Sequence, residues 1–474
     1  MPINGFLYPG AKFVKPYIVA NSCRFNSASA DSLTRSTSGA GTSNTTFTIS
    51  LWIKKSSNDS AARRLLEFYN NSSYYVSLRF RDDHSNRLDF YSESNGSAVN
   101  LRTTRSFRDP SSWYHIVMRV DTTQSTADDR LRMYVNGVQE TDFAARTNPS
   151  SSENLQFNGS GDNQLISQSG SDTANNRRFN GYMAEVCFID GQSLDPTSFG
   201  EFDSDSPTIW KPIDVSGLTF GNNGFYLDFE DSSALGNDVS GNNNDFTANN
   251  LAAIDQSTDT CTNNFATINA LDGASAGTFS EGNLTLTGST NPKATIGFTQ
   301  GKWYFECKLT TQSGSQVIGV ASENMSSGTT LGSDANGWGY VIEDNSLYGA
   351  NGKSYHNNSL SSVLQTFANN DILGVAVDMD NQALYFSVNG TFVSSGNPAS
   401  GASKTGAVFT NLPTSGFVFP CFRSTSSGVV NANFGSPAFS ISSGNADANG
   451  HGNFEYSVPS GYFALCTKNL AEFG

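Results

Sequence analysis

The sequence predicts an all-β protein made of two antiparallel β-sandwiches joined by an ordered, Asn-rich connector. Short runs of alternating apolar and polar residues are separated by clusters of Gly, Asn, Asp and Ser, which is the pattern of sandwich folds. The chain also carries one pattern twice, at 120–137 and 377–390: a strand ending in Asp, a turn, an alternating strand and Asn-Gly. Asn-Gly is the strongest short signal for a hairpin with a type I′ turn. Aromatic residues make up 12% of the chain, with 34 Phe, enough for more than one core.

The composition argues against several classes of partner. Charged residues make up 15% of the 474 residues, against about 25% in ordinary soluble domains. The net charge of −15 argues against nucleic-acid binding, for which basic clusters supply the affinity. The absence of an apolar run of about 18 residues predicts no membrane insertion. The first residues lack a basic stretch followed by an apolar one, so we expect no signal peptide.

The six cysteines do not have the spacing of a metal site. They occupy positions 23, 187, 261, 307, 421 and 466, without a Cys-x-x-Cys pair or a nearby His. Cys307 and Cys421 lie within apolar strand patterns. We therefore expect buried free thiols in a chain made in a reducing compartment.

The first half begins with an arm and continues as a series of strands. Residues 1–20 contain three prolines and predict either an extended arm for attachment or a disordered terminus. Ser60–Glu67 has helical propensity, but a strand is expected there because the following residues continue a meander. The expected strands are 47–53, 65–69, 74–80, 87–91, 113–120 and 179–189.

Residues 21–203 resemble the laminin-G/pentraxin group of concanavalin A-like jelly rolls. The resemblance rests on Phe47–Ile53, on Trp113–Val117 with the Tyr134–Gly137 hairpin, and on Phe179–Val186. It implies that the last of these segments leads into a core strand, with Val186 and Phe188 buried.

Residues 204–270 predict a packed connector rather than a free linker. Proline, Asn, Asp and Ser surround one strand at 224–229. Residues 231–245 resemble, in part, the loop that often opens laminin-G-like domains. Five aromatic residues of the connector need burial: Trp210, Phe225, Phe229, Phe246 and Phe265.

Residues 271–440 resemble a SPRY domain, a binding module without catalytic residues that is also built as a two-sheet sandwich. The motifs are Trp-Tyr-x-Glu at 303–306, Ile-Gly-Val at 318–320, Gly-Trp-Gly-Tyr at 337–340, Phe-x-Val-Asn-Gly at 386–390 and Asn-Phe-Gly at 433–435. Residues 441–474 are expected to pack back on this half. The order of the domains, with the Ala464–Leu470 end, resembles fibre-like virion proteins of tailed phages.

The sequence predicts no catalytic site. Gly273–Gly277 matches G-x-S-x-G, but its flanks lack the strand and helix that present a nucleophilic Ser275. Glycoside hydrolysis needs two carboxylates facing one cleft, whereas Glu185 and Glu306 stand alone. We expect Glu306 on the solvent face of its strand.

One acidic loop has two interpretations. Asp238, Asn242, Asn244 and Asp245 concentrate oxygen ligands within eight residues, and calcium favours such loops. The same residue types form turns by bonding their own backbone. Calcium is therefore one candidate cofactor, and a self-bonded turn is the alternative.

Loop aromatics provide the candidate ligand site. An aromatic ring stacks on a pyranose face while Asn, Asp and Gln read the hydroxyls. The candidates on the second half are Tyr348, Asn351, Tyr355 and His356, and those on the first half are Tyr74 and Tyr75. The alternative is that these are ordinary strand-end aromatics. Trp338 is expected in the core and His115 as a structural histidine.

These patterns predict a non-enzymatic virion protein of a tailed phage, a fibre or appendage that binds host surface glycans. It would be assembled in the host cytoplasm, contact other virion proteins, and form a homo-oligomer, with a trimer as one arrangement. Weak binding by loops would be raised by many copies per particle. The alternative is a structural decoration protein of the capsid or tail without a receptor.

Overall fold

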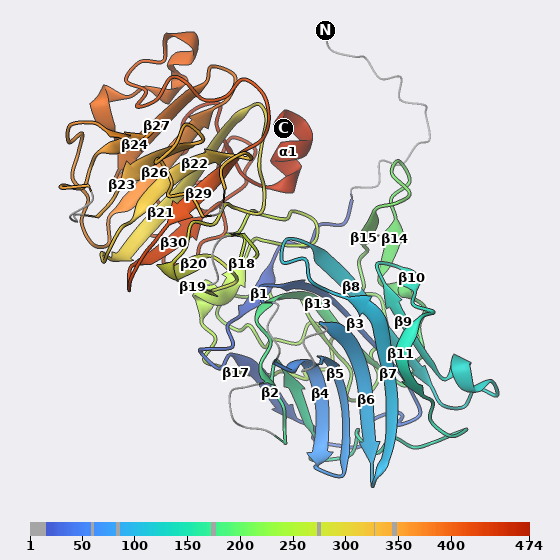
Figure 1. Cartoon of the computed structure of the whole chain (residues 1–474). Helices are drawn as coiled ribbons and strands as arrows, with labels where there is room; N and C mark the ends of the chain where they lie inside the picture. Colours follow the sequence, from blue (N-terminus) through green and yellow to red (C-terminus); the bar gives the residue numbers. More distant parts are fainter. Residues whose placement is uncertain are drawn as a thin grey trace, which may run out of the picture.

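The fold is all-β, as predicted, and contains two sandwiches (Figure 1). The computed structural model describes residues 16–57, 61–81, 86–171, 177–272, 276–326, 328–343 and 348–474. The first 15 residues of the expected arm, Ser60 and Ser275 lie outside the described residues. Among the described residues, no helix is long and apolar enough to cross a membrane.

The first sandwich pairs two eight-stranded sheets. One sheet has the order β10-β9-β8-β3-β13-β1-β18, with β16 paired to β13; the other has the order β11-β7-β6-β5-β4-β12-β2-β17. The first sheet contains β1 (Ser22–Phe25), β3 (Thr46–Lys55), β8 (Trp113–Asp121), β9 (Leu131–Val135), β10 (Val138–Gln139), β13 (Gly181–Asp190), β16 (Phe225–Leu227) and β18 (Gln256–Ser257). The second contains β2 (Ser32–Ser36), β4 (Arg63–Asn71), β5 (Tyr74–Phe80), β6 (Arg87–Ser94), β7 (Ser97–Ser106), β11 (Phe143–Thr147), β12 (Asn163–Ile166) and β17 (Thr247–Asn249).

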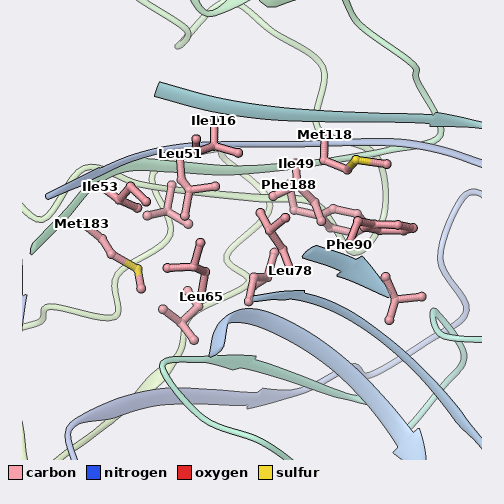
Figure 2. Packing of buried hydrophobic residues seen from close by; sticks show 14 of the residues in the cluster. Ile49, Leu51, Ile53, Leu65, Leu78, Phe90, Ile116, Met118, Met183 and Phe188 are labelled. Atoms are coloured by element: carbon pink, nitrogen blue, oxygen red, sulfur yellow. The ribbon is translucent and has the colours of Figure 1, made fainter. Parts of the chain in front are cut away.

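The core of this sandwich lies between the two sheets (Figure 2). Ile49, Leu51 and Ile53 of β3 point toward Leu78 and Phe90 of the facing sheet, because alternate residues of a strand share one face. Val186 and Phe188 are fully buried, which confirms the burial that the resemblance implies. In the described part of the Ser60–Glu67 stretch, residues 63–67 belong to strand β4, so the strand expectation is confirmed there.

Both Asn-Gly hairpins have the predicted backbone. Asn136 and Gly137 have φ values of 49° and 77°, and Asn389 and Gly390 have 49° and 79°. Positive φ at both central residues is the requirement of a type I′ turn. The first turn joins β9 to β10, and the second joins β27 (Ala383–Val388) to β28 (Thr391–Phe392).

Residues 204–270 are packed, but they belong to the first sandwich more fully than a connector would. Their strand β16 pairs with β13, β17 with β2 and β18 with β1, so the segment extends both sheets. Strands β14 (Gly200–Phe202) and β15 (Trp210–Pro212) form a separate two-stranded ribbon. The five aromatic residues expected to need burial are all buried.

The second sandwich pairs an eight-stranded sheet with a five-stranded one. The first contains β19 (Ala276–Ser280), β20 (Thr285–Ser289), β21 (Lys302–Thr311), β26 (Ile372–Asp378), β27 (Ala383–Val388), β28 (Thr391–Phe392), β30 (Val429–Asn433) and β31 (Phe463–Ala464). The second contains β22 (Val317–Ser322), β23 (Gly337–Val341), β24 (Ser354–His356), β25 (Ser359–Leu360) and β29 (Val418–Arg423). The tail packs on this sandwich: β31 pairs in parallel with β21 and is followed by α1 (Thr467–Phe473). Short 3-10 turns lie at 127–129, 196–198, 253–255, 393–395 and 398–403.

The tail explains why the expectation for Glu306 is wrong. Glu306 is fully buried rather than on a solvent face. Its carboxylate accepts hydrogen bonds from the backbone N–H groups of Glu455 and Tyr456, at 2.9 and 2.8 Å, and from the Tyr304 hydroxyl at 3.1 Å. Burial raises the pKa of Glu306. The polar residue therefore ties the tail to the sheet, which the alternation of its strand alone does not reveal.

Buried polar contacts lie where the two sandwiches meet. Lys54 of β3 bonds Asp259 at 2.7 Å, Asn264 at 2.6 Å and the Phe265 carbonyl at 3.1 Å. Arg24 of β1 donates to the Pro437 carbonyl at 3.1 Å, and Tyr182 of β13 donates to the Gly282 carbonyl at 3.0 Å. Lys54, Arg24 and Tyr182 are almost fully buried. The sandwiches thus meet through a satisfied polar interface, which we call the junction.

Candidate functional site

The predicted ligand residues of the second sandwich lie together, but three of them are buried. Tyr348 and Tyr355 are packed with their ring centroids 5.3 Å apart. The Tyr348 hydroxyl accepts a hydrogen bond from Ser315 at 3.0 Å, and the Tyr355 hydroxyl donates to Asn358 at 3.0 Å. Asn351 is bonded through both ends of its amide to the backbone of Phe367, at 2.9 Å each. These rings and amides therefore support the fold around β24 rather than present a stacking surface.

His356 is the one of these four that is half-buried. Its Nδ1 lies 2.8 Å from the Gly337 carbonyl, which only accepts, so Nδ1 carries the proton. Its Nε2 lies 3.1 Å from the Asn411 amide, and its ring stacks on buried Trp338 at 4.9 Å. The Trp338 indole N–H also donates to Asn411, at 3.1 Å. Trp338 is thus a core residue, as expected, and it holds His356 and Asn411 in place.

A small cavity adjoins this group, and we call it the Phe417 pocket. Its volume is about 270 Å³. Phe417 is 47% exposed and lies directly before strand β29 (Val418–Arg423). The signal available in the sequence was the turn-forming Pro413–Gly416 stretch directly before Phe417. The lining residues are Ser322, Glu323, Asn324, Ala335, Asn336, Trp338, Asn411, Pro413, Ser415, Gly416 and Phe417.

A second cavity at the rim of the first sandwich contains a predicted ligand residue, Tyr74. This Tyr74 pocket has a volume of about 350 Å³. Loops from both sheets of the sandwich build it, since Asn44 precedes β3 and Asn70 and Tyr74 border the β4–β5 turn. The lining residues are Asn44, Asn70, Tyr74, Asn154, Gln156, Gly159 and Asp162.

The alternation of β5 separates the two predicted tyrosines. Tyr74 lies on the same side of the strand as the core residues Val76 and Leu78, but at the strand's first position, where the sandwich opens. Tyr75 lies on the other side, where its ring packs 6.4 Å from Tyr69 and 5.7 Å from Tyr91. Only Tyr74 therefore presents its ring to the cavity.

The polar groups of the Tyr74 pocket are held in fixed positions. Asp162 accepts hydrogen bonds from the Asn70 amide at 2.5 Å and from the Gly159 N–H at 2.7 Å. Asn154 accepts from the backbone N–H of Gln156 at 2.9 Å. The side-chain oxygen of Asn44 is buried without a hydrogen-bond partner in the described chain. Among the described lining residues Asp162 supplies the one carboxyl group, so the pocket is polar with little charge.

The acidic loop satisfies its own oxygen atoms. Asp238 accepts from the backbone N–H groups of Tyr226, Ser240 and Asn244, at 2.9, 2.9 and 2.8 Å. Asp245 accepts from the Asp238 N–H at 2.9 Å. The amide groups of Asn242 and Asn244 both donate to the Gly224 carbonyl, at 3.0 and 2.7 Å. These bonds match the self-bonded turn, and calcium at this loop stays a prediction. In the part of the chain that is described, no three His, Cys, Asp or Glu residues are grouped to hold a metal ion.

The remaining titratable candidates are structural. His115 is buried; its Nδ1 accepts from the Trp210 indole N–H at 2.9 Å, which places its proton on Nε2, 2.9 Å from Ser50. Burial lowers the pKa of His115 to about 3. Glu185 is buried in the first sandwich and Glu306 in the second, so they do not face one groove. All six cysteines are free thiols, and burial raises the pKa of each.

Comparison with known proteins identifies the two sandwiches. Residues 27–195 match the model of the concanavalin A-like lectin/glucanases superfamily (Laminin_G_3), and residues 302–437 match that of the SPRY domain. Both resemblances stated from the sequence are thereby confirmed. Domains of these two kinds indicate a binding or adhesin-like role.

Individual relatives cover only parts of the chain. A probable ATP-dependent RNA helicase ddx1 of Dictyostelium discoideum is 32% identical over 98 residues, which are 21% of this chain and 11% of that protein. The solved SPRY domain of human HERC1 is 15% identical with a TM-score of 0.28, covering 35% of this chain and 96% of its own. The TRIM65 PSpry domain is 13% identical with a TM-score of 0.28, and the coverages are 35% and 91%. Stonustoxin is 19% identical with a TM-score of 0.27, and the coverages are 35% and 27%.

Proposed function

We propose that the chain is a non-enzymatic binding protein that recognises glycans of low charge, and that the Tyr74 pocket is its principal site. The observation that carries this proposal is an aromatic ring at the mouth of a cavity lined otherwise by amides, one carboxyl group and backbone. This combination suits a pyranose, because the ring covers a C–H face while amide and carboxylate groups bond the hydroxyls.

The residues of the Tyr74 pocket would have different roles in binding a glycan. Tyr74 provides the stacking surface, Asp162 and Asn154 provide acceptors already fixed by hydrogen bonds within the chain, and Gln156 adds an amide. Fixed groups lose little conformational entropy when a ligand binds. The buried oxygen of Asn44, which has no partner, would gain a donor from a hydroxyl or from a bridging water.

The biological setting that we propose is a virion of a tailed phage. The protein would be a fibre or appendage that is assembled in the host cytoplasm, contacts other virion proteins and forms a homo-oligomer, with a trimer as one arrangement. The order of a concanavalin A-like and a SPRY domain supports this setting, as does a sequence with only 15% charged residues and a net charge of −15. Many copies on one particle would convert weak single-site binding into firm attachment to host polysaccharide.

The expected result of replacing Tyr74 with Ala is a loss of glycan affinity of at least about tenfold, equivalent to about 1.4 kcal/mol. Removing the ring deletes the stacking surface, which contributes about 0.5–1.5 kcal/mol beyond the area that it buries. Binding would be measured on a glycan array with the protein displayed in many copies, followed by calorimetry on the glycans that bind.

Two further variants make this test specific. Tyr74→Phe keeps the ring and should retain binding, and Tyr75→Ala removes a neighbouring ring that faces away from the cavity. Equal affinity of Tyr74→Ala and the unmodified protein would refute the assignment of the site. Absence of any glycan binding by the displayed protein would refute the proposed function.

A further inference from the structure

Three of the chain's five tryptophans line one cavity beside the junction. Trp52 comes from β3, Trp113 from the start of β8 and Trp210 from β15, and the cavity has a volume of about 280 Å³. We call it the tryptophan pocket. Its other lining residues are Ser112, Asn136, Thr208, Cys261, Asn264 and Thr467. Thr467 begins α1, so the C-terminal tail contributes to the cavity together with the first sandwich.

Two of the indole rings are fixed by a stack around His115. The centroid of His115 lies 4.7 Å from that of Trp52 and 6.0 Å from that of Trp210, with the rings nearly parallel. The Trp210 indole N–H donates to His115 at 2.9 Å. Gly137 and Gly200 leave room for the Trp210 ring, because a Cβ there would lie only 2.3 or 2.6 Å from its atoms. Trp52 and Trp210 are buried, and their fixed rings form the apolar side of the tryptophan pocket.

Trp113 has the most accessible of the three rings. It is half-buried, and its indole N–H donates to Asp259 at 3.0 Å, which fixes the orientation of the ring. An aromatic surface that is already oriented binds a flat apolar face with little loss of rotamer freedom. The half-buried ring of Trp113 is therefore held in one orientation beside the buried rings of Trp52 and Trp210.

The lining carries no charged side chain. The charges around it are Asp109, which accepts hydrogen bonds from Ser111 and from the Ser112 hydroxyl, and the buried pair of Lys54 and Asp259, 2.7 Å apart. The oxygens of Asp259 also accept from Trp113 and from the Phe265 N–H, at 3.0 and 3.3 Å, so they are not left to balance a bound cation. Burial raises the pKa of Cys261, which keeps its thiol neutral. A quaternary ammonium ligand is disfavoured on these grounds, although aromatic cages can bind one.

Polar groups accompany the aromatic wall. The side-chain oxygen of Asn136 accepts a hydrogen bond from the backbone N–H of His115 at 2.8 Å. The side-chain N–H groups of Asn136 remain for a ligand. Thr208 is exposed at the rim, and the hydroxyl of Ser112, which donates to Asp109, adds an acceptor oxygen. A purely apolar ligand would leave the amide N–H groups of Asn136 unpaired, whereas a ligand with hydroxyls would bond them.

We propose that the tryptophan pocket is a second glycan site that takes a single neutral pyranose unit, stacked on Trp113 and bonded by Asn136. Its volume lies just below the range of about 300–1,000 Å³ typical of small-molecule sites, which suits one sugar ring rather than a long oligosaccharide. The proposal rests on the proposed glycan-binding function but concerns a different surface. Sugar bound here contacts the first sandwich and Thr467 of the tail, so it also stabilises the junction by mass action.

The test compares the full-length protein with two variants, using a panel of neutral monosaccharides: glucose, galactose, mannose and N-acetylglucosamine. Binding is followed by tryptophan fluorescence and by saturation-transfer NMR. Thr208→Phe fills the mouth of the tryptophan pocket at an exposed position, and Tyr74→Ala removes the ring of the rim pocket. We expect a saturable change with at least one sugar, unchanged in Tyr74→Ala and weakened at least tenfold in Thr208→Phe.

The outcomes separate this inference from the proposed function. Retention of Tyr74-dependent array binding by Thr208→Phe shows that this variant is folded. Absence of a saturable change with every sugar, its loss in Tyr74→Ala, or its persistence in Thr208→Phe overturns the tryptophan site, even where array binding through Tyr74 is intact. Absence of glycan binding by the unmodified protein on the array, by contrast, overturns the proposed function of the Tyr74 pocket.

Discussion

Replacing Lys54 with Met should lower the free energy of unfolding by about 3–5 kcal/mol. The ammonium group is 1% exposed and supplies three bonds, to Asp259, Asn264 and the Phe265 carbonyl. Methionine keeps much of the side-chain volume but leaves the carboxylate of Asp259 buried without its counter-charge. An unpaired buried charge costs far more than the net gain of the original pair. The loss should appear in urea unfolding followed by tryptophan fluorescence, because Trp113 bonds the same carboxylate.

A matched surface variant and a double variant isolate the cause. Lys211→Met removes ion pairs with Glu201 and Asp203 that are partly exposed, and it should change stability far less than Lys54→Met, because solvent screens exposed pairs. Lys54→Met combined with Asp259→Asn removes both charges and should recover part of the loss, since Asn still accepts from Trp113. A Lys54→Met protein as stable as the Lys211→Met protein would show that the ion pair does not hold the junction.

Stability should fall as the pH rises from about 4.5 to about 7, and Glu185 should account for about 3 kcal/mol of this fall. Burial raises the pKa of Glu185 from 4.5 to about 7, with smaller contributions from the charges of Asp228 and Glu230. The hydroxyls of Tyr226 and Tyr17 oppose this rise by donating to Glu185, at 2.8 and 3.0 Å. In the unfolded chain the carboxyl ionises near its ordinary pKa. Between these two pKa values the unfolded state binds fewer protons than the folded state. Each pH unit in this range therefore lowers the free energy of unfolding by about 1.4 kcal/mol.

Glu185→Gln is the variant that checks this pH dependence. The neutral amide can still accept from both tyrosine hydroxyls, so its stability should match the unmodified protein near pH 4.5 and exceed it by about 3 kcal/mol at pH 8. Asp31, whose pKa is also raised to about 7, contributes equally to both proteins and cancels in the difference. Glu201→Gln, at an exposed position on β14, serves as the control and should follow the unmodified profile. Parallel profiles for Glu185→Gln and the unmodified protein would count against the burial argument.

The fold could be predicted from the sequence because its signals are local. The Asn-Gly pairs specify their turns through the positive φ that both residues adopt, so both hairpins lie where the sequence places them. The burial of Val186 and Phe188 could be predicted from the alternation within one strand and from the resemblance to concanavalin A-like domains. The place of residues 204–270 in the first sandwich was harder to predict. Strands of two or three residues, such as β16 and β18, show too little alternation to indicate which sheet they extend.

The candidate site was less predictable because it depends on which end of a strand is open. Tyr74 and Tyr75 are adjacent and chemically alike, yet one lies at the open rim and the other packs on Tyr91. Tyr348 and Tyr355 stand in a turn-rich stretch, but contacts from distant Ser315 and from each other bury them. Trp113 and Trp210 lie almost a hundred residues apart, so only the pairing of the sheets could reveal that they share a cavity with Trp52.

The junction also has a mechanical consequence. Arg24 and Tyr182 connect the sandwiches through bonds to residues far along the chain, at Pro437 and Gly282, rather than through a flexible tether. A pull on the second sandwich therefore loads these bonds in parallel before it can extend the chain between them. The two sandwiches, and the cavities that each of them carries, then keep a constant separation under tension.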